Sequence, residues 1–295
     1  MLGAKIHRVA IAGGTHGNEF TGIYLVKKFQ GYPDLVQRPS FETVPLLTNP
    51  QAFALKRRYA EQDLNRCFLP ADLQSSTSTS YEALRAKELY QTLVAQPESK
   101  ADFILDLHTT TANMGLTVIL VNHHPFNLRL AAHLSAVNSA VKIYSAYQPG
   151  KTLAFLNSLC EFGFAIEVGA IAQGTLRADL FQRTEALIHT LLDYLDAANR
   201  NASPPVASSL TIYQHLRTVD YPKDEHGELL GMIHPRLQDQ DYQPLHPGAP
   251  LFLTFDGDVI CYEGDATVYP IFINEAAYYE KGIALCLTEQ QTLEL

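Results

Sequence analysis

An imidazole and a carboxylate stand three residues apart in the segment 13–19, Gly-Gly-Thr-His-Gly-Asn-Glu, where an apolar run gives way to a helical pattern. His16 and Glu19 are the metal-competent side chains of this turn, and His108 closes a second apolar run, residues 102–108. Two histidines and one glutamate are a common ligand set for catalytic zinc, one that leaves a fourth position open for water. Because sites in α/β sheets form at the carboxyl ends of strands, this spacing indicates a zinc site.

Each of these residues also has an ordinary structural interpretation. Gly13 and Gly14 could form a tight turn, His16 could lie at the surface, Glu19 could be an acid at a helix N-terminus and His108 could simply end a strand. An isolated His-x-x-Glu motif is weak support for metal binding. Other side chains must therefore carry part of the assignment.

Three further charged residues give that support. Glu167 interrupts the apolar run 164–168, and a buried carboxylate without a partner is costly, so it needs either a task or an ion pair. A general base beside an attacking water would be such a task, and a buried salt bridge with an arginine is the alternative. Arg58 and Arg66 could bind a substrate carboxylate or a developing oxyanion, or could be solvated loop charges.

The elements that must position these side chains follow from hydrophobic periodicity. Short apolar runs alternate with helix-period segments up to about residue 200, a pattern typical of an α/β domain with a parallel or mixed sheet. Strands are expected at residues 7–12, 41–47, 103–107, 116–121, 141–146 and 164–168. Helices are expected at residues 19–29, 81–93, 125–140, 152–161 and 178–198.

The texture of the chain changes after residues 199–205, where polar residues and paired prolines end the last expected helix. Beyond this segment, short apolar runs at 210–212, 249–255 and 268–273 are punctuated by Gly, Pro and Asp. We therefore predict two domains. They are a larger α/β domain over residues 1–202 and a smaller, strand-rich domain over residues 203–295.

Bulk composition limits the classes of partner and location. The net charge of −9 and the absence of Lys-rich or Arg-rich runs argue against a nucleic-acid partner. Residues 1–5 lead directly into the first expected strand, and no apolar stretch approaches bilayer length, so we expect a cytoplasmic protein without a membrane partner. The four scattered cysteines lack a Cys-x-x-Cys pair and are expected to be reduced thiols.

Ten segments spread along the chain resemble the aspartoacylase/succinylglutamate desuccinylase family, zinc N-acyl amino-acid amidohydrolases with a zinc carboxypeptidase-like fold. In the larger part they are residues 13–19, 63–66, 106–108, 166–169 and 173–179. In the smaller part they are residues 219–222, 233–235, 237–241, 244–248 and 274–281. The resemblance runs in order through nearly the whole chain, and because the carboxypeptidase relatives lack the second domain, it favours the acylase branch.

The resemblance implies a mixed-sheet catalytic domain whose cleft is capped by the strand-rich C-terminal domain. It implies that His16, Glu19 and His108 hold one Zn²⁺ per subunit, that Glu167 activates the attacking water and that Arg58 stabilises the oxyanion together with zinc. The implied reaction is hydrolysis of an N-acyl amino acid, N-acetyl-L-aspartate in the aspartoacylases, to a carboxylate and a free amino acid. A homodimer is also implied, because the family often forms dimers.

The same resemblance assigns the substrate-binding residues, with one departure. Asn65 and Arg66 would bind the carboxylate of the amino-acid part, and Tyr278 would reach into the site from the C-terminal domain. Aspartoacylases that prefer acetylaspartate carry an arginine ten positions before the catalytic glutamate, where this chain has Asn157, and a nearby family tyrosine is replaced by Leu153. Asparagine lacks the charge and the fork of arginine, so the expected clamp on a second carboxylate is weakened.

Two smaller points and several alternatives accompany this interpretation. Lys151 is a candidate replacement for the missing arginine by proximity in sequence, and Thr109 follows His108 where the family often has asparagine. The alternatives are an acylase for aromatic or aliphatic N-acetyl amino acids, a desuccinylase or carboxypeptidase-type zinc hydrolase, and a zinc-binding protein without turnover. The small-molecule substrate class is thus better defined than the amino acid itself.

Overall fold

The protein is described by a computed structural model that covers residues 5–295, so residues 1–4 of the N-terminal segment lie outside the described residues. Its strands are β1 (Arg8–Gly13), β2 (Glu42–Leu47), β3 (Phe103–Thr109), β4 (Gly115–Leu120), β5 (Val141–Ser145), β6 (Phe162–Gly169), β7 (Ser209–Asp220), β8 (Gly231–Ile233), β9 (Pro250–Thr254), β10 (Val259–Cys261), β11 (Tyr269–Ile271) and β12 (Ile283–Glu294). Its helices are α1 (Phe20–Gly31), α2 (Pro50–Leu55), α3 (Pro70–Gln74), α4 (Tyr81–Tyr90), α5 (Pro125–Val137) and α6 (Ala178–Asn199). Shorter helical turns are η1 (Pro33–Leu35), η2 (Leu64–Arg66), η3 (Gln91–Ala95), η4 (Leu156–Leu159) and η5 (Ala276–Lys281).

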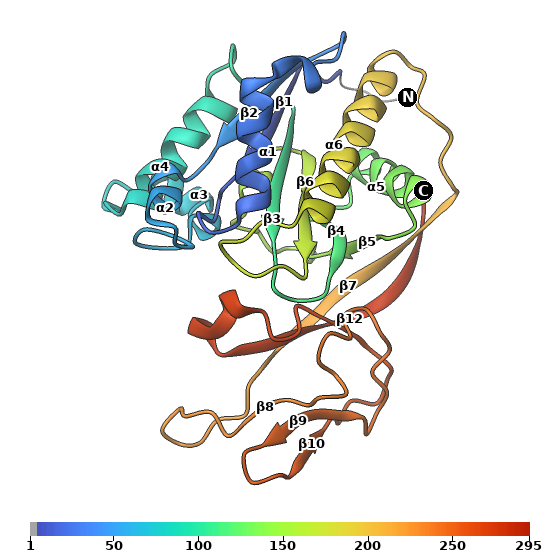
Figure 1. Cartoon of the computed structure of the whole chain (residues 1–295). Helices are drawn as coiled ribbons and strands as arrows, with labels where there is room; N and C mark the ends of the chain where they lie inside the picture. The colour runs from blue at the N-terminus through green and yellow to red at the C-terminus, as the bar shows by residue number, and fades with distance from the viewer. Residues whose placement is uncertain (1–4) are drawn as a thin grey trace.

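A nine-stranded mixed sheet runs through the molecule in the order β11-β12-β7-β5-β4-β6-β3-β1-β2 (Figure 1). β3 and β6 are buried along their whole length, as expected for apolar strands that are covered on both faces. β1, β3 and β6 are parallel neighbours, whereas β4 runs antiparallel to β6. The carboxyl ends of three neighbouring strands therefore meet at one edge of the sheet, where sites of α/β proteins form.

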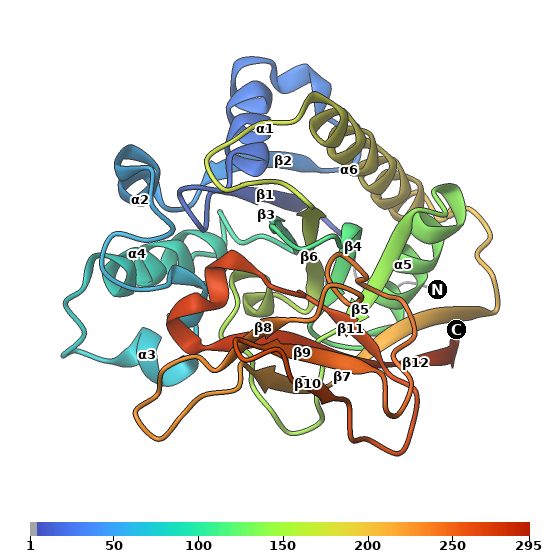
Figure 2. The same cartoon turned by 60° about the horizontal axis from the view of Figure 1, so that its bottom comes forward.

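Helices cover the two faces of this sheet, as Figures 1 and 2 show from two directions. One face packs against α1, α5 and α6 in a large core that includes Leu25, Leu130 and Leu191. The opposite face packs against α4 and η2, with Leu89 close to Ile104 of β3 in a second core. This layered arrangement confirms the predicted fold class.

The expected strands and most of the expected helices of the larger part are present, with ends displaced by a few residues. The expected helix over 81–93 forms α4 and then the π-helical turn η3. The expected helix over 152–161 is wrong, because only η4 is helical there. The Leu156 backbone N–H donates to the Asn65 Oδ1 at 3.0 Å, and the Ser158 hydroxyl donates to the carbonyls of Leu153 and Phe155. Such side-chain hydrogen bonds compete with helix formation.

The C-terminal part is smaller and strand-rich, as predicted, but two of its strands belong to the main sheet. β7 pairs with β5 on one side and with β12 along nearly its full length on the other. The short strands β8, β9 and β10 form a separate sheet, whose core contains Leu251, Phe252 and Leu285. The division at residues 202 and 203 stays a prediction, because the sheet continues across it (Figure 2).

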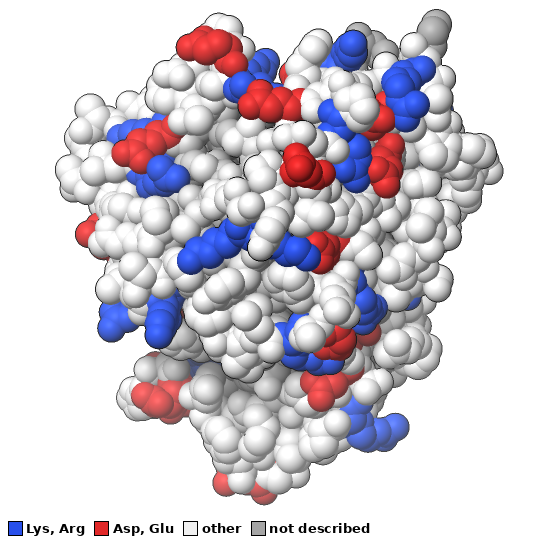
Figure 3. Space-filling view, turned by 45° about the horizontal axis from the view of Figure 1, so that its top comes forward, with Lys and Arg blue, Asp and Glu red and all other residues white. Residues whose placement is uncertain are grey.

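The described residues also test what the composition predicted about membrane spans, cysteines and surface charge. None of their helices is both long enough and apolar enough to cross a bilayer. Cys67, Cys160, Cys261 and Cys286 are free thiols, as expected. On the face seen in Figure 3, positive and negative side chains are interspersed.

Candidate metal centre and active-site pocket

In and before the turn between β1 and α1, two glycines lie where the backbone of another segment comes very close. A Cβ on Gly13 would lie 2.4 Å from the carbonyl oxygen of Gly22, and one on Gly17 would lie 2.1 Å from the carbonyl carbon of Ala52. No side chain fits at such distances, so glycine at these two positions lets α1 and α2 pack directly against the turn. The turn places His16 beside Glu19, which is the N-cap residue of α1.

Two neighbouring strands supply the remaining members of the cluster. His108 on β3 and Glu167 on β6 are register partners in the parallel pair. Asp106 lies two residues before His108 and therefore on the same face of the strand. The apolar strands thus place three ionisable side chains at one sheet edge.

His16, Glu19 and His108 form a buried group whose ligand atoms all lie within 4.8 Å of one another. The Nδ1 atom of His16 is 2.6 Å from Oε1 of Glu19, and the Nδ1 atom of His108 is 3.0 Å from Oε2. Two imidazole nitrogens and a carboxylate converging from separate segments are able to bind a divalent metal ion.

In each of these histidines, the ring nitrogen that points away from Glu19 contacts a second carboxylate. The Nε2 atom of His108 is 2.8 Å from Asp106, and the Nε2 atom of His16 is 3.0 Å from Asp63. Asp106 is fully buried and also accepts a hydrogen bond from the Thr15 hydroxyl at 2.8 Å. Carboxylates in this position fix the tautomer of a metal-binding histidine, so both rings present Nδ1 to the cluster. The orienting role of Asp63 was not anticipated, because 47 residues separate it from His16.

The electrostatics of the cluster suit a metal ligand. Burial alone would raise the pKa of Glu19, but the neighbouring imidazoles of His16 and His108 hold it well below its usual range. Burial would likewise raise the pKa of Asp63, but His16 and Arg58 lower it. Both carboxylates are therefore ionised, as ligands and their orienting partners must be.

Glu167 has the opposite environment. Burial, together with the carboxylates of Glu19 and Glu275, holds its pKa well above the usual range, although His108 and Arg58 act against this rise. Its Oε1 atom is buried and has no hydrogen-bond partner among residues 5–295. A carboxyl group with a raised pKa, a free oxygen and a place beside a metal cluster can accept and return a proton.

Arginine and asparagine side chains line the pocket next to the cluster. Arg58 donates to Glu19 at 3.2 Å and to Asp63 at 3.3 Å, which holds its guanidinium beside His16 and Glu19. The guanidinium of Arg66 stacks on the Phe155 ring, with 5.1 Å between its carbon and the ring centroid. The backbone N–H of Asn65 donates to Asp63 at 2.9 Å, so Asp63 connects His16 to this segment.

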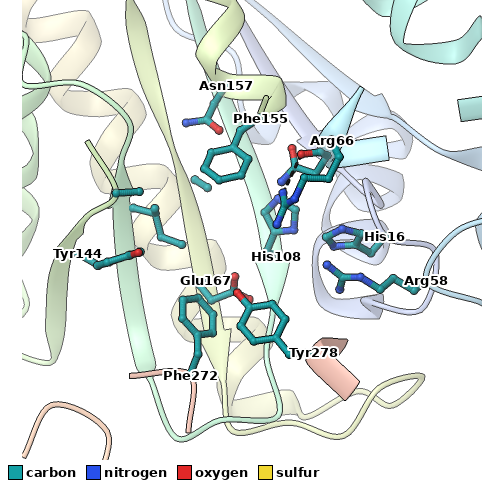
Figure 4. Close-up of a pocket in the computed structure, with 14 residues that line it drawn as sticks. His16, Arg58, Arg66, His108, Tyr144, Phe155, Asn157, Glu167, Phe272 and Tyr278 are labelled. Carbon is teal, nitrogen blue, oxygen red and sulfur yellow. Dashed lines mark hydrogen bonds between the residues drawn. The ribbon is translucent and has the colours of Figure 1, made fainter. Parts of the chain in front are cut away.

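The C-terminal part contributes Phe272 and Tyr278, which Figure 4 shows opposite Phe155 and Asn157 across the pocket. Burial raises the pKa of the Tyr278 phenol, which therefore stays neutral. Glu275 holds this segment in place. Its Oε2 accepts from the Thr111 backbone N–H at 2.7 Å, from the Thr111 hydroxyl and from the Thr110 hydroxyl.

The rest of the pocket wall is mainly apolar. Ile119, Tyr144, Ala146 and Ala165 complete it beside the residues already named. Asn157 is 1% exposed, and its Nδ2 has no hydrogen-bond partner within residues 5–295. Lys151, the suggested replacement for a missing arginine, is exposed and is not among the described residues that line this pocket.

The structure thus brings every sequence-predicted site residue to one place, while their roles stay predictions. The carboxylate of Glu19 lies beside His16 and His108. The other eight line a single pocket: His16, Arg58, Asn65, Arg66, His108, Asn157, Glu167 and Tyr278. Sequence reasoning missed Asp63, Glu275, Phe272 and Tyr144. Asp63 and Glu275 lie within segments that carried the resemblance, which is the one signal that pointed toward them.

Comparisons with known proteins show the family to which the chain belongs. The family model described as "Succinylglutamate desuccinylase/Aspartoacylase catalytic domain" matches residues 5–195, and the "AstE/AspA barrel-sandwich hybrid domain" matches residues 208–290. A "Probable aspartoacylase" of Trichodesmium erythraeum is 56% identical over 291 residues, 99% of each chain. An "N-acyl-aromatic-L-amino acid amidohydrolase (carboxylate-forming)" of Homo sapiens is 44% identical, over 97% of this chain and 92% of the human one.

Among solved structures, murine aminoacylase 3 superimposes with a TM-score of 0.93 at 42% identity, and the match covers 98% of this chain and 97% of the murine one. Similarity of this extent includes both the catalytic sheet and the C-terminal part. The chain therefore belongs to the succinylglutamate desuccinylase/aspartoacylase family.

Proposed function

We propose that this protein is a zinc-dependent amidohydrolase that cleaves N-acyl amino acids, with a preference for aromatic or apolar amino acids over aspartate. The observation that carries the hydrolase assignment is the convergence of His16, Glu19 and His108 within 4.8 Å, beside Glu167 and Arg58. The names of the bacterial and human relatives support the same reaction class.

The donor set fits Zn²⁺. Two imidazole nitrogens and one carboxylate match catalytic zinc sites, which keep one position for water or substrate. Asp63 and Asp106 contact the Nε2 atoms of His16 and His108 and orient both rings for metal binding. When bound, zinc supplies Lewis acidity, which lowers the pKa of water and polarises a carbonyl oxygen.

Four residues of the pocket have separate roles in the proposed reaction. Glu167 takes a proton from the attacking water and returns it to the departing amine, for which its free Oε1 and raised pKa are suited. Arg58 donates to the carbonyl oxygen as negative charge develops there. Arg66 binds the amino-acid carboxylate, and Asn65 completes that contact.

The proposed preference for apolar side chains rests on the pocket wall. Ile119, Tyr144, Phe155 and Phe272 offer an apolar surface to the substrate side chain. Asn157 stands where an aspartate-selective site needs a guanidinium, and its amide adds hydrogen bonding without charge. An aspartate carboxylate would lose its hydration on this surface without a matching cation, whereas an aromatic ring would gain from burial.

Amine release tests this proposal. The purified protein is analysed for zinc and assayed on N-acetyl-Phe, N-acetyl-Leu, N-acetyl-Asp and a Phe-containing dipeptide. We expect turnover of the N-acetyl amino acids, with kcat/KM higher for Phe and Leu than for Asp, and little turnover of the dipeptide. Full activity after exhaustive chelation would refute zinc dependence, and higher kcat/KM on N-acetyl-Asp would refute the preference. A cytoplasmic location and a homodimer remain predictions of the sequence.

A further inference from the structure

A buried carboxylate outside the pocket takes no direct part in the proposed reaction. Glu82 lies in the first turn of α4, is 0% exposed and is not among the residues that line the pocket. Glutamates in a first helical turn are mostly exposed, and there they interact with the helix dipole. Ser80 already caps α4, since its hydroxyl accepts from the backbone N–H of Ala83 at 3.2 Å. Glu82 is therefore available to segments other than its own helix.

Four hydrogen-bond donors from other segments converge on the Glu82 carboxylate. The consecutive backbone N–H groups of Ala60, Glu61 and Gln62 donate to it at 2.6, 3.1 and 3.2 Å. The Asn49 side chain donates to it at 3.1 Å. A buried carboxylate is stable only when its oxygens have hydrogen-bond partners, so Glu82 and these donors hold one another in place.

The segment bound by this carboxylate carries two groups of the active site. We call residues 58–63 the arginine loop, because Arg58 begins it and Asp63 ends it. The loop contains no helix or strand, so a regular ladder does not satisfy its backbone N–H groups. Arg58 contacts Glu19, and Asp63 contacts the Nε2 atom of His16. The three amides held by the carboxylate thus lie between the proposed oxyanion donor and the residue that orients a zinc ligand.

The fourth donor connects the same carboxylate to the turn that carries His16. Asn49 is the N-cap residue of α2, and its backbone N–H donates to the Gly14 carbonyl at 3.2 Å. From the arginine loop, the Arg58 carbonyl accepts from the Gly17 backbone N–H at 3.0 Å. These two contacts lie on either side of His16 in the sequence, so both segments that the carboxylate binds also support the zinc ligand.

We propose that Glu82 is a positioning residue of the active site. It holds the arginine loop so that Arg58 reaches the substrate carbonyl and Asp63 orients His16. The inference rests on the proposed amidohydrolase function and adds a residue that does not line the pocket. A displacement of about 1 Å at a catalytic group costs about a hundredfold in rate. Loss of the Glu82 carboxylate should therefore change kcat, the zinc affinity and the exchange of the loop amides.

Glu82→Gln tests the link to Arg58 in the zinc-loaded protein, with N-acetyl-Phe as substrate. The new side chain keeps the size of glutamate but brings an NH₂ group to donors that need an acceptor. Because Arg58 acts in the transition state, we expect kcat to fall by about tenfold, with a smaller change in KM. In an Arg58→Ala background the loop has no arginine to position, so the same change should lower kcat by less than about twofold. Equal losses in both backgrounds would overturn the inference.

Two measurements do not depend on turnover. In the wild type, hydrogen exchange should show protected amides at Ala60, Glu61 and Gln62, and in Glu82→Gln these amides should exchange at least about tenfold faster. Competition with a chromophoric chelator should give a zinc Kd about tenfold higher in the variant, the lower range for a lost partner of a metal-binding histidine. Fast exchange of these amides in the wild type would overturn the inference, even if Glu82→Gln failed to fold.

Glu88 offers a matched control on the same helix. Its side chain is 66% exposed and contacts Arg85 at 3.0 Å. Glu88→Gln makes the same chemical change at the surface of α4 and should leave kcat, the zinc Kd and the exchange of the loop amides unchanged. Equal effects in the two glutamine variants would overturn the inference. Absence of turnover by the wild type would overturn the proposed function, whereas exchange and zinc affinity would still decide whether Glu82 holds the loop.

Discussion

Replacing Glu275 by alanine should separate the C-terminal segment from the active site. Its Oε2 accepts from the backbone N–H groups of Thr111 and Ala112 at 2.7 and 3.3 Å, and its Oε1 accepts from the backbone N–H of Ala277 at 2.9 Å. The hydroxyls of Thr110 and Thr111 donate to the same carboxylate. Five donors thus converge on one side chain that is 6% exposed.

The expected loss of stability follows from the hydrogen-bond donors that lose their acceptor in Glu275→Ala. A buried donor without an acceptor costs about 1–3 kcal/mol, and water can reach some of these groups in the variant. We therefore expect the free energy of unfolding to fall by about 2–5 kcal/mol, at the upper end of single substitutions. Since Tyr278 lies three residues after Glu275, kcat/KM should fall as well.

Urea unfolding and amine-release kinetics on the same preparations measure both effects. Glu225→Ala is a matched control, because Glu225 is an exposed residue that makes only a 3.6 Å contact with the exposed His226 within residues 5–295. We expect the control to change the free energy of unfolding by less than about 0.5 kcal/mol. Glu275→Ala with wild-type stability and kinetics would refute the view that this carboxylate anchors the segment.

Three further changes test other parts of the site and fold. Glu167→Gln should retain zinc but lower kcat by at least about a hundredfold, as metal analysis and amine release would show; unchanged turnover would remove Glu167 from the mechanism. Asn157→Arg should raise kcat/KM on N-acetyl-Asp relative to N-acetyl-Phe by supplying the absent charge, and an unaltered ratio would contradict the assignment of Asn157. Burial raises the pKa of Asp241 to about 7, although the backbone N–H groups of Ile273 and Asn113 oppose this. Between about pH 4 and 7 the folded protein therefore holds a proton on Asp241 that the unfolded chain has lost. The contribution of Asp241 to the free energy of unfolding thus falls as the pH rises through this range. In urea unfolding at several pH values, Asp241→Asn should make this fall shallower.

Much of the site could be predicted because its residues end apolar runs. His16, Glu19, His108 and Glu167 are polar side chains at positions where a buried strand stops or is interrupted, and the parallel order of the strands brings such ends together. Their location depends on local periodicity and one general rule of sheet topology. That information is present in the sequence without any knowledge of long-range contacts.

The contacts between distant segments could not be predicted in the same way. Asp63 orients His16 from a surface loop, and Glu275 holds a loop that lies 164 residues earlier. Neither segment has a periodicity that indicates its partner. The wrongly predicted helix over 152–161 has the same origin, because Asn65 captures the Leu156 N–H that a helix would have used.

The pairing of β7 with β5 and β12 limits how the entrance to the site can move. A rigid rotation of the C-terminal part would break backbone hydrogen bonds along a continuous sheet, which costs far more than rearranging surface turns. Admission of substrate is thus expected to depend on the turn η5 and the loop that follows α2.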